Sequence, residues 1–554
     1  MALKPCATLS SVVSGGHGVY MTVGIHVAEE ITGGERIARA DTATVAFIGR
    51  TLRGPVNESV TLRSFSDYQA VFGGLWQPAP LSYAIEHFFE NGGLCACVVR
   101  VINGGRAATI TLPTQSAKAW HLEALCPGTR EFLRVAVDYD NIASADENSF
   151  NLVVQRVRAP GQEHIEDQEI YTRASVDPSS PRYVGFLIAE SALVRLKTAS
   201  DERPLTTSRS DGRLVSAYVS SNPDGDDGAP LTDYDVIGSA TEGTGLFAFG
   251  AEVPFNFLYV PPLSRDHAVG PGIRLIAARI CRNRRALLIV DPPIEWASPQ
   301  DAAEGMRHVD LVTDDALMYF PWIQAYDRLR ASFQPFAPGA AAAGMLSRLQ
   351  TECPFWVAGE AEDAPLRPGL RPICAVSDEW RERLAQAGLN TFTTVRARQP
   401  LPARTLGGLR TPTSAWRYLS AKRLALFVMS SIERGTRWVV FEQAGPALSQ
   451  RVHGQVADFL GSLAADGAFA PSAEGPNWVA VCDERLQRAD EPHSVHVLFG
   501  FAAERADDWH CWVLTQEATG SRINPVGFDR VKSILAQARR APVASEASAG
   551  RLTA

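Results

Sequence analysis

The stretch that decides the fold is APLSYAIEHFFENGGLCACVVRVI, Ala79 to Ile102. Pro80 lies near the first turn of a predicted helix whose apolar residues share one face, and Gly92 follows its end. The apolar run LCACVVRVI then predicts a fully buried strand, and TVAFIG, Thr44 to Gly49, predicts a second one upstream. Strand, helix and apolar strand in this order indicate a layered α/β unit.

Outward from this unit, the pattern changes three times. SFSDYQAVFGG predicts a short helix capped by Ser64 or Ser66. From Ala107 to about Thr198, the runs ATITLP, FLRVAVDYD, FNLVVQRV and YVGFLIAE predict a mostly β insertion. VPFNFLYVPP, IRLIAARICRNRR and ALLIVDPP then restore the α/β pattern, whereas the Pro- and Gly-rich stretch 333–372 is expected to be irregular.

The last third has the clearest periodicity. YLSAKRLALFVMSSIERG predicts a helix that Gly435 ends, TRWVVFE a strand, and GPALSQRVHGQVADFLGSLAADG a helix from Pro446 to Gly467. NWVAVCDE, SVHVLFGFAAE and DDWHCWVLTQ predict three further strands, NPVGFDRVKSILAQARR a helix, and 541–554 disorder. The second of these helices has one continuous apolar seam, formed by Leu448, Val452, Val456, Phe459, Leu460 and Leu463.

A lone strand is predicted near the N-terminus, in GVYMTVGIHVAEE, between flexible flanks. A strand without a partner leaves its backbone groups unpaired, so it must join a sheet of this chain or of another chain. The residue pattern leaves two alternatives open: pairing with a second copy, or a hairpin in which TGGE turns the strand back against TVAFIG. The apolar face consists of Val19, Met21, Val23, Ile25 and Val27.

Composition excludes several classes of function. A length of 554 residues predicts two to four domains, and a net charge of -8 argues against a nucleic-acid surface. No apolar run is long enough to span a bilayer, so membrane insertion is not expected. The N-terminus shows no secretory signal, which predicts synthesis in a cytoplasm. Nine scattered cysteines indicate reduced thiols.

The search for chemistry finds no catalytic motif, and no catalytic, metal or cofactor-binding residues are predicted. There is no phosphate-binding loop, nucleophile elbow or HExxH helix. Asp291 ends an apolar strand, where open α/β sheets bind ligands, but no partner residue accompanies it. The trio Asp224, Asp226 and Asp227 lacks the spacing of a calcium loop and indicates a solvated turn. A metal site at the pair Cys95 and Cys97 lacks a second ligand pair.

Several of these segments, in order, resemble the contractile tail sheath protein family. The segments are VAFIGRTLRGPVN, SFSDYQAVFGG, YAIEHFFENGGLCACVVRV, RYVGFLIAESALVRL, DGAPLTDYDVIGSATEGTGLFAF, FNFLYVPP, ALMYFPWIQAYDRL and WRYLSAKRLALFVMSSIERGTRWVVFE. The resemblance runs from about Gly18 to Gln516. Departures are APGAAAAGMLSR in place of the family's PPSGavAG, Leu406 where tryptophan is expected, a displaced N-terminal element, and a tail after Gly520 without counterpart.

The predicted fold class is a mixed α/β (α+β) core with a mostly β inserted domain and extended N- and C-terminal arms. The expected domains are an N-terminal arm (1–40), the first part of the core (41–106), the β-rich insertion (107–198), a middle α/β domain (199–400), a C-terminal domain (401–520) and a partly disordered tail (521–554).

The resemblance implies a structural subunit, not an enzyme. Such subunits stack as six-fold rings around an inner tube protein, contact baseplate and terminator or cap proteins, and need no cofactor. They are assembled in the bacterial cytoplasm as part of a phage tail or phage-like particle. Their arms add strands to neighbouring sheets, so the strand at 19–27 would be donated. The expected receiving positions are Val479, Val481, Val495, Val497, Phe499, Phe501, Trp512 and Leu514.

Two alternatives to a sheath subunit remain at this point. One is a cytoplasmic α/β enzyme with its site near Asp291. The other is a non-contractile coat or adhesion protein.

Overall fold

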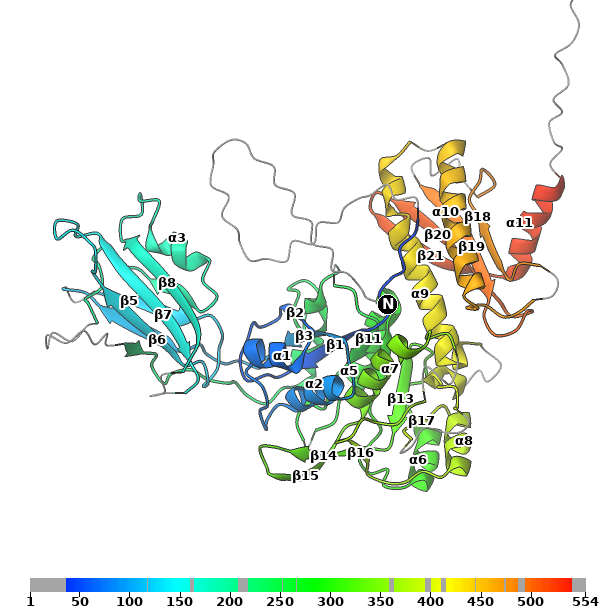
Figure 1. Cartoon of the computed structure of the whole chain (residues 1–554), viewed down its shortest axis with the longest axis horizontal. Helices are drawn as coiled ribbons and strands as arrows, with labels where there is room; N and C mark the ends of the chain where they lie inside the picture. Colours follow the sequence, from blue (N-terminus) through cyan, green and yellow to red (C-terminus); the bar gives the residue numbers. More distant parts are fainter. Residues whose placement is uncertain are drawn as a thin grey trace, which may run out of the picture.

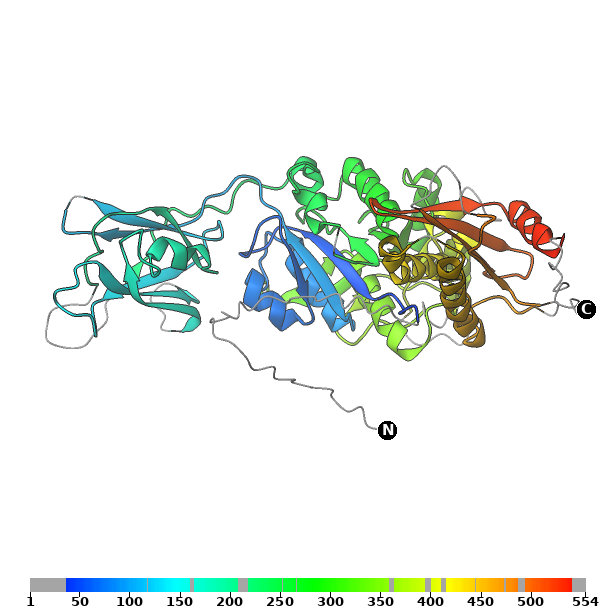
Figure 2. The same cartoon turned by 90° about the horizontal axis from the view of Figure 1, so that it is seen from above.

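The computed structural model describes residues 36–540, except 117, 160–163, 208–217, 252, 266, 358–362, 394–399, 410–414, 444, 473–474 and 487–493. Three bodies follow one another along the long axis of the molecule: the inserted domain, the α/β core and the C-terminal domain (Figures 1 and 2). The predicted mixed α/β class with a β-rich insertion is confirmed. The strand predicted at 19–27 lies outside the described residues.

The core is built on a seven-stranded sheet in the order β17-β13-β12-β11-β1-β3-β2. All neighbours are parallel except β2, which runs antiparallel to β3. The strand order reverses at β1, which pairs with β3 on one side and with β11 on the other. The strands are β1 (Thr44–Gly49), β2 (Ser59–Leu62), β3 (Cys95–Arg100), β11 (Phe257–Tyr259), β12 (Leu287–Val290), β13 (Ala316–Phe320) and β17 (Asn390–Thr391).

Helices cover both faces of this sheet, so its strands are apolar on both sides. Val45 and Phe47 of β1 face the layer of α1, α2 and α7, whereas Ala46 and Ile48 face α5, α6 and α8. The helices are α1 (Phe65–Phe72), α2 (Pro80–Glu90), α4 (Asp233–Ile237), α5 (Pro271–Arg284), α6 (Pro299–Gly305), α7 (Gly339–Glu352) and α8 (Asp378–Gln386), with 3-10 turns at η1 (Gly245–Phe249), η2 (Met306–His308) and η3 (Leu406–Leu409).

The prediction that 333–372 is irregular is wrong for much of this stretch, because it contains the 14-residue helix α7. Its alanines and glycines let it pack directly under α2: a Cβ on Gly344 would lie 2.4 Å from the backbone oxygen of Phe88. A small three-stranded sheet, β15-β14-β16, flanks this helix. Its strands are β14 (Ile323–Asp327), β15 (Ser332–Phe336) and β16 (Arg371–Pro372).

The inserted domain holds two antiparallel sheets, ordered β10-β6-β7-β8 and β4-β5-β9. YVGFLIAE, expected as a strand, forms helix α3 (Val184–Ala189) instead, since a short apolar run fits either element. The domain also extends past the expected boundary at 198, because β10 pairs with β6 and Asn222 donates to Thr109. Its strands are β4 (Thr109–Pro113), β5 (Ala119–Ala124), β6 (Leu133–Asp138), β7 (Ser149–Val157), β8 (Ile165–Ser175), β9 (Val194–Thr198) and β10 (Val219–Ser220).

The C-terminal domain packs the long helices α9 (Leu419–Gly435) and α10 (Pro446–Ala465) on a sheet ordered β18-β19-β20-β21. TRWVVFE was predicted as a strand and is instead the 3-10 helix η5 (Arg437–Phe441), and a further turn, η4 (Ala415–Arg417), precedes α9. The strands are β18 (Trp478–Val481), β19 (Val495–Ala502), β20 (Trp509–Glu517) and β21 (Gly520–Val526).

The domain does not end at residue 520, where the predicted tail begins. β21 pairs with β20 over seven residues, and α11 (Phe528–Arg540) packs on the sheet through Val531, which is fully buried. The helix predicted in NPVGFDRVKSILAQARR is confirmed by α11, and the pairing of β21 with β20 joins this stretch to the C-terminal domain.

Candidate assembly surfaces

The two faces of the C-terminal sheet are both covered within the chain. Val479 and Val481 lie on the face that α11 covers, in contact with a cluster that includes Val531. The other six expected receiving residues lie on the opposite face, in the cluster formed with α9 and α10. These six are Val495, Val497, Phe499, Phe501, Trp512 and Leu514.

A strand from another chain can be added only at an unpaired sheet edge, and in this sheet order only the two outer strands have one. β19 pairs with β18 and β20, and β20 pairs with β19 and β21, so neither can receive a further strand. The expectation that β19 and β20 receive an arm is therefore wrong. Within the described residues, the free edges belong to β18 and β21.

The apolar seam of α10 faces the inside of the domain. The structure buries all six seam residues beneath the C-terminal sheet: Leu448, Val452, Val456, Phe459, Leu460 and Leu463. They therefore form core, and any external contact of α10 must use its opposite, polar side.

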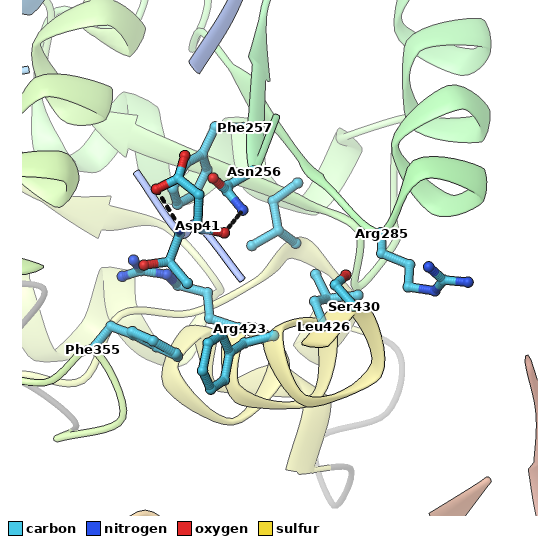
Figure 3. A pocket seen from close by; sticks show the side chains of 11 residues that line it. Asp41, Asn256, Phe257, Arg285, Phe355, Arg423, Leu426 and Ser430 are labelled. Atoms are coloured by element: carbon cyan, nitrogen blue, oxygen red, sulfur yellow. Dashed lines mark hydrogen bonds between the residues drawn. The ribbon is translucent and has the colours of Figure 1, made fainter. Parts of the chain in front are cut away.

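The segment that follows the N-terminal arm is fixed between the core and α9. Asn256 donates to the backbone oxygen of Asp41 at 2.7 Å, and the backbone N–H of Ala40 donates to Ser431 of α9 at 3.0 Å. Figure 3 shows Asp41 beside Arg423 and Phe257 in this crevice. The cavity there measures about 30 Å³, room for about one water molecule, so it is not a ligand site. The arm thus leaves the body from an anchored point.

Glu433 is a polar contact between three parts of the chain. Its carboxylate pairs with Arg285 at the end of α5 and accepts a hydrogen bond from Ser521 of β21. Gln516 of β20 donates to the backbone oxygen of Glu433 at 2.8 Å. The Glu433 side chain is 11% exposed, so these contacts fix the C-terminal domain against the core in a largely water-free setting.

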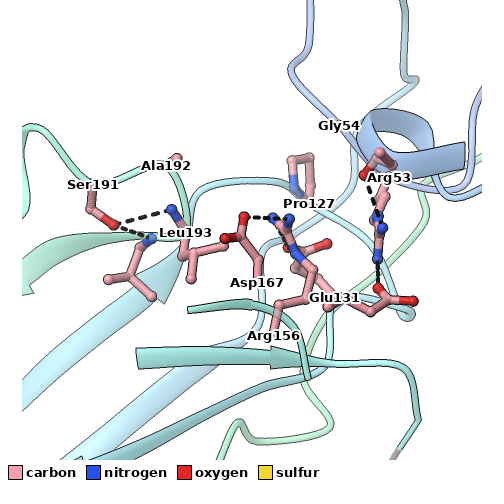
Figure 4. A network of polar contacts seen from close by, with 12 residues as sticks. Arg53, Gly54, Pro127, Glu131, Arg156, Asp167, Ser191, Ala192 and Leu193 are labelled. Atoms are coloured by element: carbon pink, nitrogen blue, oxygen red, sulfur yellow. Dashed lines mark hydrogen bonds and ion pairs between the residues drawn. The ribbon is translucent and has the colours of Figure 1, made fainter. Parts of the chain in front are cut away.

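The inserted domain joins the core through two antiparallel chain segments and a group of arginines. Asp226 and Arg106, one in each of these two segments, exchange backbone hydrogen bonds, and we call this connection the neck. Arg53 pairs with Glu166 of β8 at 2.6 Å, and the buried Arg100 donates to the backbone oxygen of Pro127 at 2.8 Å. Figure 4 shows this network.

Within the inserted domain, Arg156 extends the network. It reaches Glu131 at 2.7 Å and Asp167 at 3.6 Å. Arg53 and Arg100 therefore link the inserted domain to the core, whereas Arg156 joins residues within the inserted domain.

Asp291 lies at the carboxyl end of β12, as expected, but both its oxygens are occupied. One accepts from the Tyr259 hydroxyl at 2.7 Å, and the other accepts from the backbone N–H of Gly339 at the start of α7 at 2.8 Å. Burial raises the pKa of Asp291 to about 7. The residue holds α7 against β11, and two pockets of about 270 and about 220 Å³ flank this end of the sheet.

Polar residues that suggested metal chemistry are used in local structure. Asp224 accepts from Thr109, and Asp227 accepts from Thr129, each through backbone and side-chain groups. In the part of the chain that the structure describes, no cluster of His, Cys, Asp and Glu is suited to hold a metal ion. No described helix is long and apolar enough to cross a bilayer.

Sequence reasoning missed the contacts of Glu433, Arg53 and Arg100. The contacts described above join residues at least 27 positions apart, so no local spacing indicates them. It also missed β21. All residues of this strand are exposed or half-buried, so its sequence resembles that of a loop. The ordered helix signal immediately after β21 was the available clue that the sheet continues.

The comparisons place this architecture among known folds. No family model matches the sequence, and the search of curated proteins gives no match. The crystal structure of the sheath tail protein Lin1278 from Listeria innocua aligns with a TM-score of 0.55 at 13% identity, over 87% of this chain and 97% of that one.

Two further alignments have lower scores. The contracted PVC sheath complex of an extracellular contractile injection system aligns at 16% identity over 89% of this chain and 96% of that one, with a TM-score of 0.48. The contracted helical sheath of the anti-feeding prophage aligns at 15% identity over 88% and 97%, with the same score. Of the three, the alignment with the Listeria protein is the one that shows the fold. This chain has the fold of a sheath tail protein.

Proposed function

We propose that this chain is the structural subunit of a contractile tail sheath. Copies stack as six-fold rings around an inner tube, and the assembly shortens to drive the tube through a target envelope. The observation that carries the proposal is the likeness to the Listeria sheath tail protein, which spans 87% of this chain. Its partners are other copies, the tube protein, and baseplate and cap proteins, and it assembles in the bacterial cytoplasm.

Linkage between copies is proposed to use the N-terminal strand at 19–27. The hairpin alternative loses its acceptor, because β1 is paired on both sides, with β3 and with β11. The free edges of β18 and β21 are the remaining acceptors in the C-terminal sheet. A strand donated to one of them satisfies backbone groups that are otherwise left to water.

Contraction is proposed to be a repacking between two lattices. A modest gain in buried surface per copy, summed over many copies, supplies the work, since packed interfaces switch between discrete arrangements. The linked arms keep neighbouring copies connected while the rigid bodies rotate. The energy is stored at assembly.

Electron microscopy of the overexpressed protein tests the proposal. We expect hollow cylinders with helical striations for the full chain, in one or two diameters. A variant lacking residues 1–30 should stay folded and form no cylinders. Full-length protein that stays monomeric in the presence of tube protein would contradict the proposal, and cylinders of one fixed length only would favour a non-contractile coat.

A further inference from the structure

One pocket at the carboxyl ends of the core strands has an aromatic lining and opens to solvent. It lies between α2, the end of β11 and β15, and its volume is about 220 Å³. This is below the roughly 300–1,000 Å³ that pockets for drug-sized ligands have, and it suits one large side chain. Ile294, 47% exposed, stands at its rim. Its walls include Tyr83, His87, Tyr259, Trp322 and Phe336.

The charged residues that line this α2–β15 pocket are Arg265 and Arg330. Arg265 lies 5.0 Å from the Tyr83 ring centroid and 5.2 Å from that of Phe336, and it pairs with the buried Asp327 at 2.6 Å. Arg330 is 3.9 Å from the same carboxylate. Two cations share one anion, so the rim keeps a positive charge.

The imidazole of His87 also lines the pocket. The His87 ring is buried edge-on against Phe336, and burial lowers its pKa to about 4. The neutral imidazole at neutral pH has one donor and one acceptor nitrogen, which complement a hydroxyl.

The same chain exposes a side chain with the complementary properties. Tyr234 in α4 is 85% exposed, the most of any large apolar or aromatic residue in the described part of the chain. Asp233 and Asp235 flank it in the sequence, and the Asp235 carboxylate accepts hydrogen bonds from the backbone N–H and the hydroxyl of Thr232. The two carboxylates give the surface around the Tyr234 ring a negative charge. Phe441, 78% exposed, has neither a hydroxyl nor an acidic residue on both sides.

We propose that Tyr234 of one copy inserts into the α2–β15 pocket of a neighbouring copy, with Asp233 and Asp235 facing Arg265 and Arg330. The inference rests on the proposed self-assembly. The contact joins two different surfaces of one chain, and such heterologous contacts build closed rings or open helices. Buried tyrosines beside arginines are the residues that dominate binding energy at protein interfaces.

Two variants and a matched control test the contact. Tyr234→Ala removes the inserted side chain, and Ile294→Glu adds a negative charge at the rim that repels Asp233 and Asp235. Each should raise the protein concentration needed for assembly roughly tenfold or more, as measured by light scattering and microscopy. Phe186→Ala removes an aromatic side chain of 61% exposure on the inserted domain and should leave that concentration unchanged. Circular dichroism and thermal unfolding confirm that each variant folds.

Mixing the two variants gives the sharper result. The Tyr234→Ala copy keeps an intact pocket, and the Ile294→Glu copy keeps an intact tyrosine. Below the concentration at which either variant assembles alone, the mixture should form one Tyr234 contact per pair and stop there. If both variants assemble at the same concentration as the wild-type protein, this inference is overturned and the proposed function stands. Wild-type protein that never assembles would overturn both.

Discussion

The junction between the N-terminal segment and α9 depends on a glycine, Gly435, which packs against Ile37. A Cβ on Gly435 would lie 2.8 Å from Cγ2 of Ile37, closer than packed carbon atoms approach. Gly435→Ala should therefore destabilise the protein by about 1–3 kcal/mol in thermal or urea unfolding. Gly454→Ala in α10 is the control: nothing lies within 4 Å of its added Cβ, and it should stabilise by about 0.5–1 kcal/mol. Equal effects would contradict the close approach.

Glu86, on the buried helix α2, should make stability depend on pH. Burial and then the charge of Glu90 raise its pKa from 4.5 to about 7, although Arg328 at 3.4 Å opposes this. Between these values the folded chain binds more protons than the unfolded chain, so stability falls as pH rises from about 4.5 to about 7. Glu86→Gln should remove about 2 kcal/mol of that fall, measured by urea unfolding at several pH values. An unchanged pH profile would refute this role for Glu86.

At the scale of elements, β21 and α11 complete the C-terminal sheet domain. A chain ending at residue 517 loses both, which exposes the face formed by Val479, Val481 and Cys511 and opens the edge of β20. Its C-terminal domain should unfold roughly 5 °C or more below the full chain in calorimetry. A chain ending at residue 540 keeps both elements and serves as control. Identical melting of the two truncations would show that 518–540 contributes nothing to the domain.

At the scale of the whole molecule, Arg53 and Arg100 link the inserted domain to the core, and we expect them to restrict its orientation. Arg53→Ala removes the pair with Glu166 and a hydrogen bond to the backbone oxygen of Ala70 at 3.0 Å. We expect a broader distribution of particle dimensions in small-angle scattering, with little change in the melting of either domain. Lys118→Ala, which removes an exposed pair with Asp201, should leave the scattering unchanged. An unaltered profile for Arg53→Ala would mean that the backbone segments of the neck suffice.

The sequence by itself determined those elements whose buried residues form a regular pattern along the chain. The continuous apolar runs of β1 and β3, the one-sided apolar faces of α9 and α10, and the apolar residues at every second position of β19 are all visible in the sequence, because each is a local pattern along one element. The ordered segments also indicated the sheath fold that the Listeria structure supports.

Only the tertiary structure decided the rest, because the deciding contacts come from distant residues. α7 is buried nearly all round by small residues, so it has no polar face to mark it as a helix, and α2 gives it its place. β21 is a strand because β20 offers it an edge. The order of the sheet is likewise non-local. It alone determines that β18 and β21, rather than β19 and β20, have unpaired edges within the described residues.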